Sequence, residues 1–321
     1  MPKPPPQTLP ELDAMMTLSE AFERAARDDP ALDGARLEEV IRLVPGKHAL
    51  IGGHLGAQAA IFRFHIEEGE ARARRDWAEL TRAAVHMGGG DLRVNQPLHH
   101  LPDLGLVVVE RIFATPLMQH IWQAEHERRC DYLGPAAAWL RKYTAPSEER
   151  ASARLEGWFA RARRGMERQP YEMLRPVEAA LMEEITRIAP PFEGTPWRWA
   201  ICHGDFHPNN LLVAGARVTG IDIGGSSMLP IYKDMARFLA HMARRGLNPS
   251  RTRHLGVDRA GFAAFAETFA LNATEREIWL PFMIGIEALI RVESPALSRA
   301  RIRWSKAFYE ELLEGLRDIR P

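Results

Sequence analysis

Short apolar runs separated by turn residues dominate the chain between residues 35 and 112. Four of these runs have the length and composition of β-strands: 40–44, 48–55, 59–66 and 107–112. Pro45-Gly46 separates the first two runs and has the composition of a tight turn. Between the third and fourth runs, residues 67–84 are rich in alanine and charged side chains, which favours a helix. The pattern therefore predicts a small β-rich lobe over residues 35–112.

From Thr115 onward the spacing of apolar residues becomes helical. The expected helices lie at 136–142, 151–168 and 171–188, and another follows Thr274 to Glu277, which fits a capping box. One interval, residues 199–222, breaks the pattern with an apolar start, a loop rich in His, Asp and Asn, and two short strands. The fold class is therefore α+β, with residues 113–321 forming a larger, mainly helical lobe.

Residues 1–34 precede the first strand and differ in composition from the rest. Five prolines fall within residues 1–10, which predicts a mobile tail. Thr17 and Glu20 fit a capping box that opens a short helix, and this helix should end at about Arg27. We therefore expect a tail and one short helix ahead of the two lobes.

Composition and charge narrow the classes of function. The 321 residues include 42 Lys+Arg and 42 Asp+Glu, and this zero net charge argues against a nucleic-acid or anionic-membrane partner. The longest apolar stretch, 279–290, is too short for a membrane span and contains Glu287, so no membrane insertion is expected. The N-terminus lacks the apolar core of a signal peptide, which predicts a cytoplasmic protein. No motif specifies an oligomeric state.

Lysine and cysteine are both scarce. The lysines are Lys3, Lys47, Lys142, Lys233 and Lys306, and every other basic residue is an arginine. Chemistry that needs a lysine must therefore use one of these five. Cys130 and Cys202 show no CxxC pattern, which argues against a disulfide framework or a zinc ribbon.

The segment 203–210, His-Gly-Asp-Phe-His-Pro-Asn-Asn, carries the clearest chemical pattern. Asp205 precedes Asn210 by five residues, as in the kinase pattern H-x-D-x-x-x-x-N, and Asp222 begins a D-x-G where that pattern has D-F-G. Phosphoryl transfer needs one carboxylate to accept or orient the acceptor hydroxyl, while amide and carboxylate oxygens hold Mg²⁺ against the phosphates. Asp205 would take the first role, and Asn210 and Asp222 the second. A loop of Asp and Asn residues that cap turns is the alternative without catalysis.

These motifs resemble those of the aminoglycoside phosphotransferase and choline kinase group of small-molecule kinases. The resemblance rests on 203–210, 220–222 and 234–236, and extends weakly over 35–240. It implies a bilobal protein-kinase-like fold, with Asp205 as catalytic base, Asn210 and Asp222 as Mg²⁺ ligands, and ATP, or alternatively GTP, under the first lobe. Asp234 resembles the structural aspartate of this family, and a plain helix N-cap is the alternative.

In the first lobe an arginine stands where the family has a strand lysine. Arg63 occupies that strand position, and Asp76 on the next helix occupies the position of the paired glutamate, with Glu79 as a competing acid. An arginine fork can bind phosphate and carboxylate, and its longer reach offsets the shorter aspartate. The alternatives are a strand arginine that faces solvent and an exposed helix carboxylate.

The resemblance also places a phosphate-binding loop at the first hairpin turn and a link between the lobes at 110–112. Gly46 frees backbone N–H groups that can hold an anion, and Lys47 is the lysine of that turn. A solvated turn lysine is the alternative for Lys47. The backbone of Glu110 and Ile112 would contact the adenine.

The leading hypothesis is an ATP- and Mg²⁺-dependent phosphotransferase acting on a hydroxyl of a small molecule, namely an amino sugar, an amino alcohol or a sugar. A nucleotide-binding, catalytically weak regulator of the pseudokinase type is the alternative, because Arg63 and Asp76 depart from the family pair. A two-metal phosphoesterase is a third hypothesis, prompted by Gly204 to His207. The chain lacks the G-N-H-[DE] and G-H-x-H elements that would support it.

Overall fold

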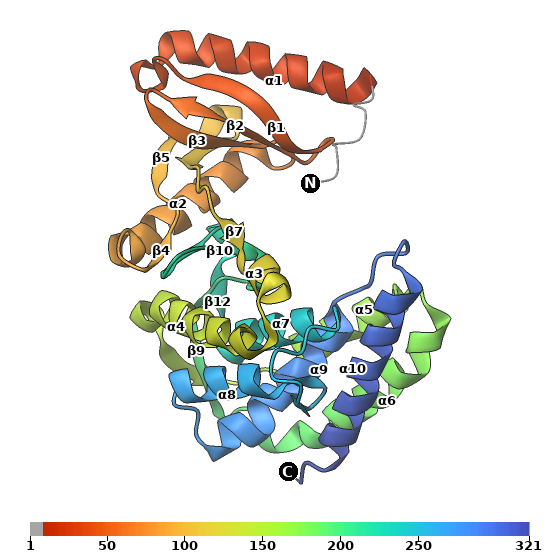
Figure 1. Ribbon diagram of the computed structural model, residues 1–321. Helices are drawn as coiled ribbons and strands as arrows, with labels where there is room; N and C mark the ends of the chain where they lie inside the picture. Colours follow the sequence, from red (N-terminus) through yellow and green to blue (C-terminus); the bar gives the residue numbers. More distant parts are fainter. Residues whose placement is uncertain (1–8, 321) are drawn as a thin grey trace. The chain divides into compact units, whose positions relative to one another are not determined.

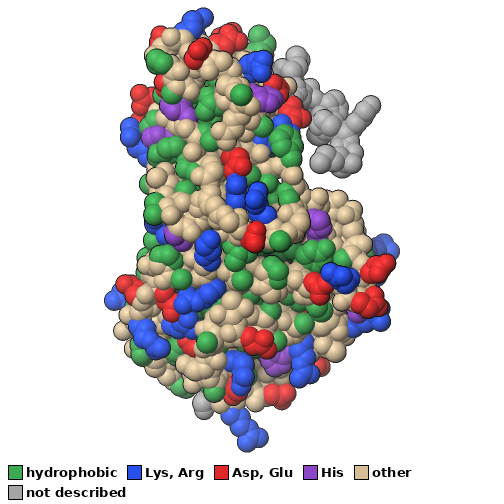
Figure 2. All heavy atoms as spheres, turned by 60° about the vertical axis from the view of Figure 1, so that its left-hand side comes forward, with side chains coloured by type: hydrophobic (Ala, Val, Ile, Leu, Met, Phe, Trp, Pro, Cys, Tyr) green, Lys and Arg blue, Asp and Glu red, His purple; other side chains and the backbone are tan. Residues whose placement is uncertain are grey.

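The computed structural model describes residues 9–320 and contains two compact units, Met1–Phe113 and Ala114–Pro321 (Figure 1). Most of the predicted proline-rich tail lies outside the described residues. The first unit is built on a sheet and the second mainly from helices, which confirms the α+β class. Among the described helices, none combines the length and the apolar composition that a membrane span requires. On the face drawn in Figure 2, basic and acidic side chains are interspersed, as the zero net charge suggests.

The first unit contains a five-stranded antiparallel sheet with the order β1-β2-β3-β6-β5. Its strands are β1 (Arg36–Val44), β2 (His48–Leu55), β3 (Gln58–His65), β5 (Pro97–Leu101) and β6 (Leu106–Glu110). The other elements are α1 (Leu9–Asp28), α2 (Gly69–Met87), β4 (Leu92–Val94) and the 3-10 turns Pro30–Leu32 and Pro102–Leu104. All four predicted strands are present. Strand β5 was missed because a proline and two histidines interrupt its apolar pattern.

Side chains of β3 alternate between the two faces of this sheet, and the alternation decides where Arg63 lies. Phe62 and Phe64 are fully buried in a core that includes Phe22 of α1. The ring of Phe22 meets these two rings edge to face at centroid distances of 5.4 and 6.2 Å. Arg63 therefore lies on the opposite face of the sheet, where it contacts Asp76 of α2.

Helix α1 begins at Leu9, well before the predicted start at Thr17. Thr17 lies inside the helix, where its hydroxyl donates to the carbonyl oxygen of Asp13 at 2.9 Å. The predicted capping box at Thr17 and Glu20 is therefore wrong, because this hydroxyl bonds to the preceding turn instead of a helix end. The predicted end near Arg27 agrees with the observed last residue, Asp28.

The second unit is mainly helical. Its α-helices are α3 (Leu117–Gln123), α4 (Leu133–Thr144), α5 (Glu156–Glu167), α6 (Arg175–Ile188), α7 (Tyr232–Ala243), α8 (Arg259–Thr268), α9 (Leu280–Ile290) and α10 (Arg299–Arg317). Its strands are β7 (Thr115–Pro116), β8 (Glu149–Ser152), β9 (Pro196–Cys202), β10 (Leu211–Ala214), β11 (Arg217–Gly220), β12 (Ser227–Pro230), β13 (Arg253–His254) and β14 (Val257–Asp258). Strand β9 pairs with β8 and β12, and β10 pairs with β7 and β11.

Shorter helical turns complete this unit. The 3-10 segments are His126–Tyr132, Ala145–Ser147, Glu172–Leu174, Pro190–Phe192, Pro208–Asn210 and Ile223–Gly225, and a π-helical turn spans Glu275–Trp279. The turn Pro208–Asn210 ends the motif-bearing loop, and Ile223–Gly225 directly follows Asp222. The predicted chemistry is therefore located on two connections, both at strand ends.

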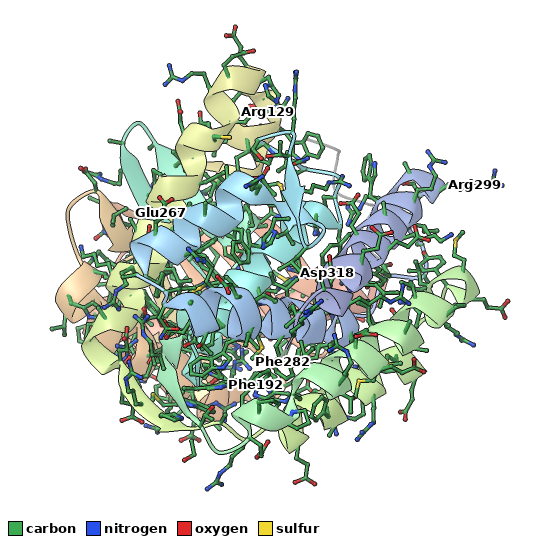
Figure 3. All side chains as sticks on the ribbon, turned by 90° about the horizontal axis from the view of Figure 1, so that it is seen from below. Arg129, Phe192, Glu267, Phe282, Arg299 and Asp318 are labelled. Atoms are coloured by element: carbon green, nitrogen blue, oxygen red, sulfur yellow. The ribbon has the colours of Figure 1, made fainter. Side chains whose placement is uncertain are left out.

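Helices α7 and α9 form the centre of the second unit. Phe282 of α9 packs edge to face against Phe192 at a centroid distance of 5.9 Å (Figure 3). Every residue of α7 is buried, including Lys233, Asp234 and Arg237. Buried charges need partners, so a helix of this composition indicates a polar site beside it.

Two predicted helix starts in the second unit are wrong. The predicted helix 151–168 overlaps β8, which pairs with β9, and α5 begins only at Glu156. Pairing with a strand distant in sequence overrides the helix propensity of these Ala and Arg residues. The capping box predicted at Thr274 lies two residues earlier. Asn272 Oδ1 accepts from the Glu275 N–H, and Glu275 Oε2 accepts from the Asn272 N–H, both at 2.9 Å.

Candidate active site

The loop 203–210 follows β9 and is held by the start of α7. At Gly204 the backbone φ is 85°, and a Cβ atom there would lie 2.6 Å from the carbonyl oxygen of Gly225, so the position requires glycine. The Gly204 N–H donates to both carboxylate oxygens of Asp234 at 3.2 Å, and Lys233 Nζ donates to the Gly204 carbonyl oxygen. Asp234 therefore binds the loop and is not the N-cap of α7. These contacts fix the backbone directly before Asp205.

Asn210 and His203 connect this loop to the end of β11. Asn210 Nδ2 donates to the carbonyl oxygen of Asp205 at 3.0 Å, and the Asn210 carbonyl oxygen accepts from the Ile221 N–H at 3.0 Å. The imidazole of His203 is fully buried, with Nε2 3.0 Å from the Ile221 carbonyl oxygen. The structure thus brings Asp205 and Asn210 together. Asp222 directly follows Ile221, whose backbone is held by both Asn210 and His203.

Asp222 occupies a strained turn. Its backbone is left-handed, with φ 63° and ψ 46°, and its side chain is exposed. This conformation costs a residue other than glycine about 1 kcal/mol, and such strain is concentrated at functional sites.

The donor set of Asn210 and Asp222 suits a magnesium ion. An amide oxygen and a carboxylate are the hard oxygen ligands that Mg²⁺ prefers. Within the described part of the chain, no group of three His, Cys, Asp or Glu side chains could hold a metal ion. A divalent ion at these two residues would therefore take its other ligands from phosphate and water oxygens, as Mg²⁺ commonly does beside nucleotides.

Three basic side chains surround the carboxylate of Asp205. Arg237 Nε and Arg291 Nη2 each donate to Oδ1 at 2.9 Å, and His207 Nε2 lies 3.5 Å from Oδ2. Burial alone would raise the pKa of Asp205. The contact with His207 and the charges of Arg237 and Arg291 outweigh burial and hold this pKa well below its usual range. The carboxylate is therefore ionised at neutral pH, and its side chain remains 43% exposed.

Sequence reasoning identified Asp205 but missed both arginines. Lys233, Arg237 and His241 recur at every fourth position of α7 and so lie on one face of the helix. That spacing was a usable signal, because basic residues at helical spacing in an otherwise apolar helix indicate a polar face. Arg291 offers no such signal, because it follows an apolar helix and meets Asp205 across a sequence separation of 86 residues.

In the first unit the structure brings Arg63 and Asp76 together. Arg63 Nη1 lies 3.3 Å and His65 Nε2 2.8 Å from Asp76 Oδ2, and Arg72 Nε lies 3.3 Å from Oδ1. Burial alone would raise the pKa of Asp76, but His65, Arg63 and Arg72 together lower it. Glu79, the competing acid, pairs with the arginine three residues later. Neither Arg63 nor Asp76 is a solvated surface charge.

Gly46 and Lys47 lie in the hairpin turn between β1 and β2. Gly46 has a φ of 71°, which suits glycine, and the side chain of Lys47 is exposed. The Lys47 carbonyl oxygen accepts from the N–H groups of Ile66 and Glu67, at 2.8 and 3.2 Å. The turn is therefore anchored to the chain just after β3, while the lysine side chain extends into solvent.

Glu110 and Ile112 are the predicted backbone contacts for adenine. Glu110 is the last residue of β6, and its N–H donates to the carbonyl oxygen of Gln96 at 2.9 Å. The Glu110 carboxylate pairs with Arg93. Ile112 lies two residues beyond the strand and is half-buried. Because the Glu110 N–H is already bonded within the sheet, an adenine contact at Glu110 would have to use its carbonyl oxygen.

The fold and the loop 203–210 together indicate a kinase of small molecules, and comparison with known proteins confirms this class. The sequence model of the phosphotransferase enzyme family (APH) matches residues 51–269, more than half of the chain. The chain therefore belongs to this family and is a small-molecule kinase. Among curated proteins, none matches the chain.

Solved structures of small-molecule kinases share the fold over nearly the whole chain. A choline/ethanolamine kinase family protein from Mesorhizobium loti is 15% identical, with a TM-score of 0.59 over 94% of this chain and 99% of that one. Aminoglycoside phosphotransferase APH(4)-Ia is 12% identical, with the same TM-score and coverage. Amicoumacin kinase hAmiN, solved with AMP-PNP, Ca²⁺ and Ami, is 12% identical, with a TM-score of 0.57 over 96% of each chain. At these identities the similarity establishes the fold alone, and it confirms the predicted kinase-like architecture.

Proposed function

We propose that this kinase transfers the γ-phosphoryl group of ATP to a hydroxyl of a small molecule, with Asp205 orienting that hydroxyl. One observation carries the proposal. Asn210 contacts the backbone of both Asp205 and Ile221, so it joins the loop that bears Asp205 to the turn that bears Asp222. The complex of hAmiN with AMP-PNP and Ca²⁺ supports a nucleotide and a divalent cation as the ligands.

The contacts of Asp205 favour orientation of the acceptor over strong base catalysis. Its Oδ1 is held by Arg237 and Arg291, whereas Oδ2 has the longer contact to His207 and is better placed to accept a hydrogen bond from the acceptor hydroxyl. A carboxylate with a lowered pKa is a weak base. The loose transition state of phosphoryl transfer needs little proton removal before the phosphoryl group moves, so Asp205 can take the proton late.

Asn210 and Asp222 would hold Mg²⁺, which neutralises phosphate charge when bound. Asn210 Nδ2 is engaged by the Asp205 carbonyl oxygen, so the amide presents Oδ1 as its ligand atom. The exposed carboxylate of Asp222 supplies the second oxygen. Both residues contribute oxygen donors of the kind that the ion requires.

Arg63 would bind the nucleotide phosphates, with Asp76 holding its guanidinium in place. A planar guanidinium can contact a carboxylate and a phosphate at once, which a single ammonium does with less directional control. The observed contact of Arg63 with Asp76 reproduces the cation–carboxylate pair that the family resemblance implies. This pairing weakens the case for a catalytically weak regulator, which rested on the two substitutions.

The test is a phosphorylation screen with ATP and GTP against pooled metabolites and antibiotics, comparing wild type with Asp205→Asn. The variant should lose about 10³-fold in kcat, or about 4 kcal/mol of transition-state stabilisation, because the acceptor is no longer oriented. Asp131→Asn is the matched control, since Asp131 lies in the same unit and its side chain is 53% exposed. Unchanged turnover in Asp205→Asn, with an unchanged Tm, would reject the assignment.

A further inference from the structure

Four arginines form a basic cluster, and two of them contact Asp205. This arginine cluster consists of Arg237 of α7, Arg245 just after α7, Arg291 just after α9, and Arg301 of α10. Arg237 and Arg291 share Oδ1 of Asp205, each at 2.9 Å. The side chain of Arg237 is only 11% exposed, so most of its charge is withdrawn from water.

The members of the cluster repel one another. Burial, Arg301 and Arg237 together lower the pKa of Arg245 to about 10. Burial and Arg291 likewise lower the pKa of Arg237. Arg245 Nη1 donates to the carbonyl oxygen of His241 at 3.1 Å, and Arg301 Nε to that of Arg244 at 3.2 Å. Among the residues that the structure describes, no carboxylate lies within ion-pair distance of Arg245 or Arg301.

The nearest carboxylates are shared between the cluster and cations outside it. Glu287 is 1% exposed and lies 3.9 Å from Lys233 and 3.6 Å from Arg291. Glu293 is 8% exposed, accepts from a serine hydroxyl at 2.8 Å and lies 3.6 Å from Arg244. The cluster therefore keeps positive charge in excess, next to the carboxylate that would orient the acceptor.

We propose that the acceptor is an alcohol that also carries an anionic group, a carboxylate or a phosphate, bound by the arginine cluster. The inference rests on the proposed function, since it takes the acceptor hydroxyl to lie at Asp205. An ammonium-bearing acceptor, such as an amino sugar or an amino alcohol, would add positive charge to four guanidinium groups that already repel one another. A carboxylate or phosphate matches the guanidinium fork and relieves that repulsion.

A competing role for these arginines is to stabilise the charge of the transferred phosphoryl group. An arginine in that role affects every acceptor equally, whereas one that binds an anionic group of the acceptor affects only anionic acceptors. Arg245 can separate the two roles, because it belongs to the cluster but hydrogen-bonds to the His241 carbonyl oxygen and not to Asp205. It is therefore the first residue to substitute.

The experiment measures steady-state phosphorylation by the full chain with Mg·ATP and four acceptors that differ at one group: glucose, glucosamine, glucuronate and glucose 6-phosphate. At least one anionic member should exceed glucosamine by about tenfold or more in kcat/KM. Arg245→Gln should raise the KM of that acceptor about tenfold, retain most of kcat and leave glucose unchanged. Arg299→Gln is the matched control, because Arg299 lies at the exposed start of α10 and points away from the helices (Figure 3).

A preference for glucosamine, or an equal loss with all four acceptors in Arg245→Gln, overturns the proposal while leaving the kinase assignment intact. If none of the four is phosphorylated, their effect on the Tm of the chain with Mg·ADP decides. Stabilisation confined to the anionic members and lost in Arg245→Gln supports the proposal, and stabilisation without that selectivity, or none, overturns it. Calorimetry with Mg·ATP tests the proposed function separately. If the chain binds no nucleotide, the proposed kinase reaction is contradicted, whatever the acceptor.

Discussion

Asp76 in the first unit and Asp205 in the second have the same kinds of partners but different surroundings. Each carboxylate is contacted by two arginines and one histidine. The side chain of Asp76 is 3% exposed, whereas that of Asp205 is 43% exposed. Basic partners lie 2.8 to 3.3 Å from the two oxygens of Asp76, while the two arginines at Asp205 share one oxygen and His207 lies 3.5 Å from the other.

This difference separates a carboxylate that holds structure from one that can meet a ligand. Removing one partner from a buried ion pair leaves an uncompensated charge and costs several kcal/mol, whereas a half-exposed pair contributes little to stability. Asp205 also keeps one oxygen in looser contact, where a hydroxyl can approach. We therefore expect substitutions at Asp76 to act first on stability and substitutions around Asp205 to act first on activity.

Asp76→Asn should give the largest change in stability. The neutral amide removes the counter-charge of His65 and Arg72 and one carboxylate partner of Arg63, so the free energy of unfolding of the first unit should fall by about 3 kcal/mol. Urea denaturation followed by circular dichroism measures the change. Asp91→Asn, an exposed aspartate of the same unit, is the control. If both variants unfold at the same urea concentration, Asp76 does not have the structural role that its burial indicates.

The difference in the free energy of unfolding between wild type and Asp76→Asn should also depend on pH, and it should become smaller in acid. The pKa of Asp76 in the folded chain lies below its ordinary value of 3.8, so the ionised carboxylate stabilises the fold above that pH. This contribution is lost as the pH falls through the folded-state pKa. The stability difference between wild type and Asp76→Asn should therefore shrink below about pH 4. A difference that persists unchanged there contradicts the lowered pKa.

Arg63→Ala should have the next largest effect and tests which residue contacts the nucleotide phosphates. The variant should raise the KM for ATP or lower kcat by about tenfold or more, because it removes a charge-assisted contact to phosphate. Lys47→Ala should change the same constants by about twofold or less, since its side chain is exposed in a turn. Arg63→Lys should recover part of the loss. A larger effect of Lys47→Ala would assign the phosphate contact to the turn.

Arg237→Gln should weaken the binding of an anionic acceptor, as loss of a cluster member predicts, and should also give the smallest effect in this series, a shift in pH dependence. This variant lacks one of the cations that oppose burial and keep the pKa of Asp205 low, so that pKa rises. The acidic limb of the kcat/KM profile should therefore move to higher pH. Arg237→Lys keeps the charge and should stay closer to wild type. If Arg237→Gln and Arg237→Lys have the same acidic limb, that limb does not report the ionisation of Asp205.

Local patterns in the sequence predicted much of this fold and part of the site. The hairpins of the first unit follow from alternating apolar residues and the turn at Pro45-Gly46. The motif 203–210 predicted the proximity of Asp205 and Asn210, because five residues in one loop cannot place them far apart. The pairing of Arg63 with Asp76 was expected from the family resemblance, which places a cation on that strand and an acid on the next helix.

Local sequence patterns did not predict contacts between segments that are distant in the chain. Strand β8 exists because it pairs with β9, and its own residues favour a helix. The start of α1 was missed because the prolines around Leu9 suggested a tail, although the helix accommodates Pro10 in its first turn. Arg291 reaches Asp205 only through the packing of α9, and nothing in its neighbouring residues predicts that. Site residues that come from distant elements, such as Arg291, can therefore be identified only from the structure.

The left-handed backbone at Asp222 bears on how this chain can be engineered. Glycine at that position would relieve about 1 kcal/mol of conformational strain, and asparagine tolerates the conformation better than most residues. Either change would remove the carboxylate. If Asp222 holds Mg²⁺ as proposed, selection for heat resistance and selection for phosphate transfer would favour different residues at one position. A library screened only for folding would then collect Asp222→Gly early, and the most stable members would lack the proposed Mg²⁺ ligand.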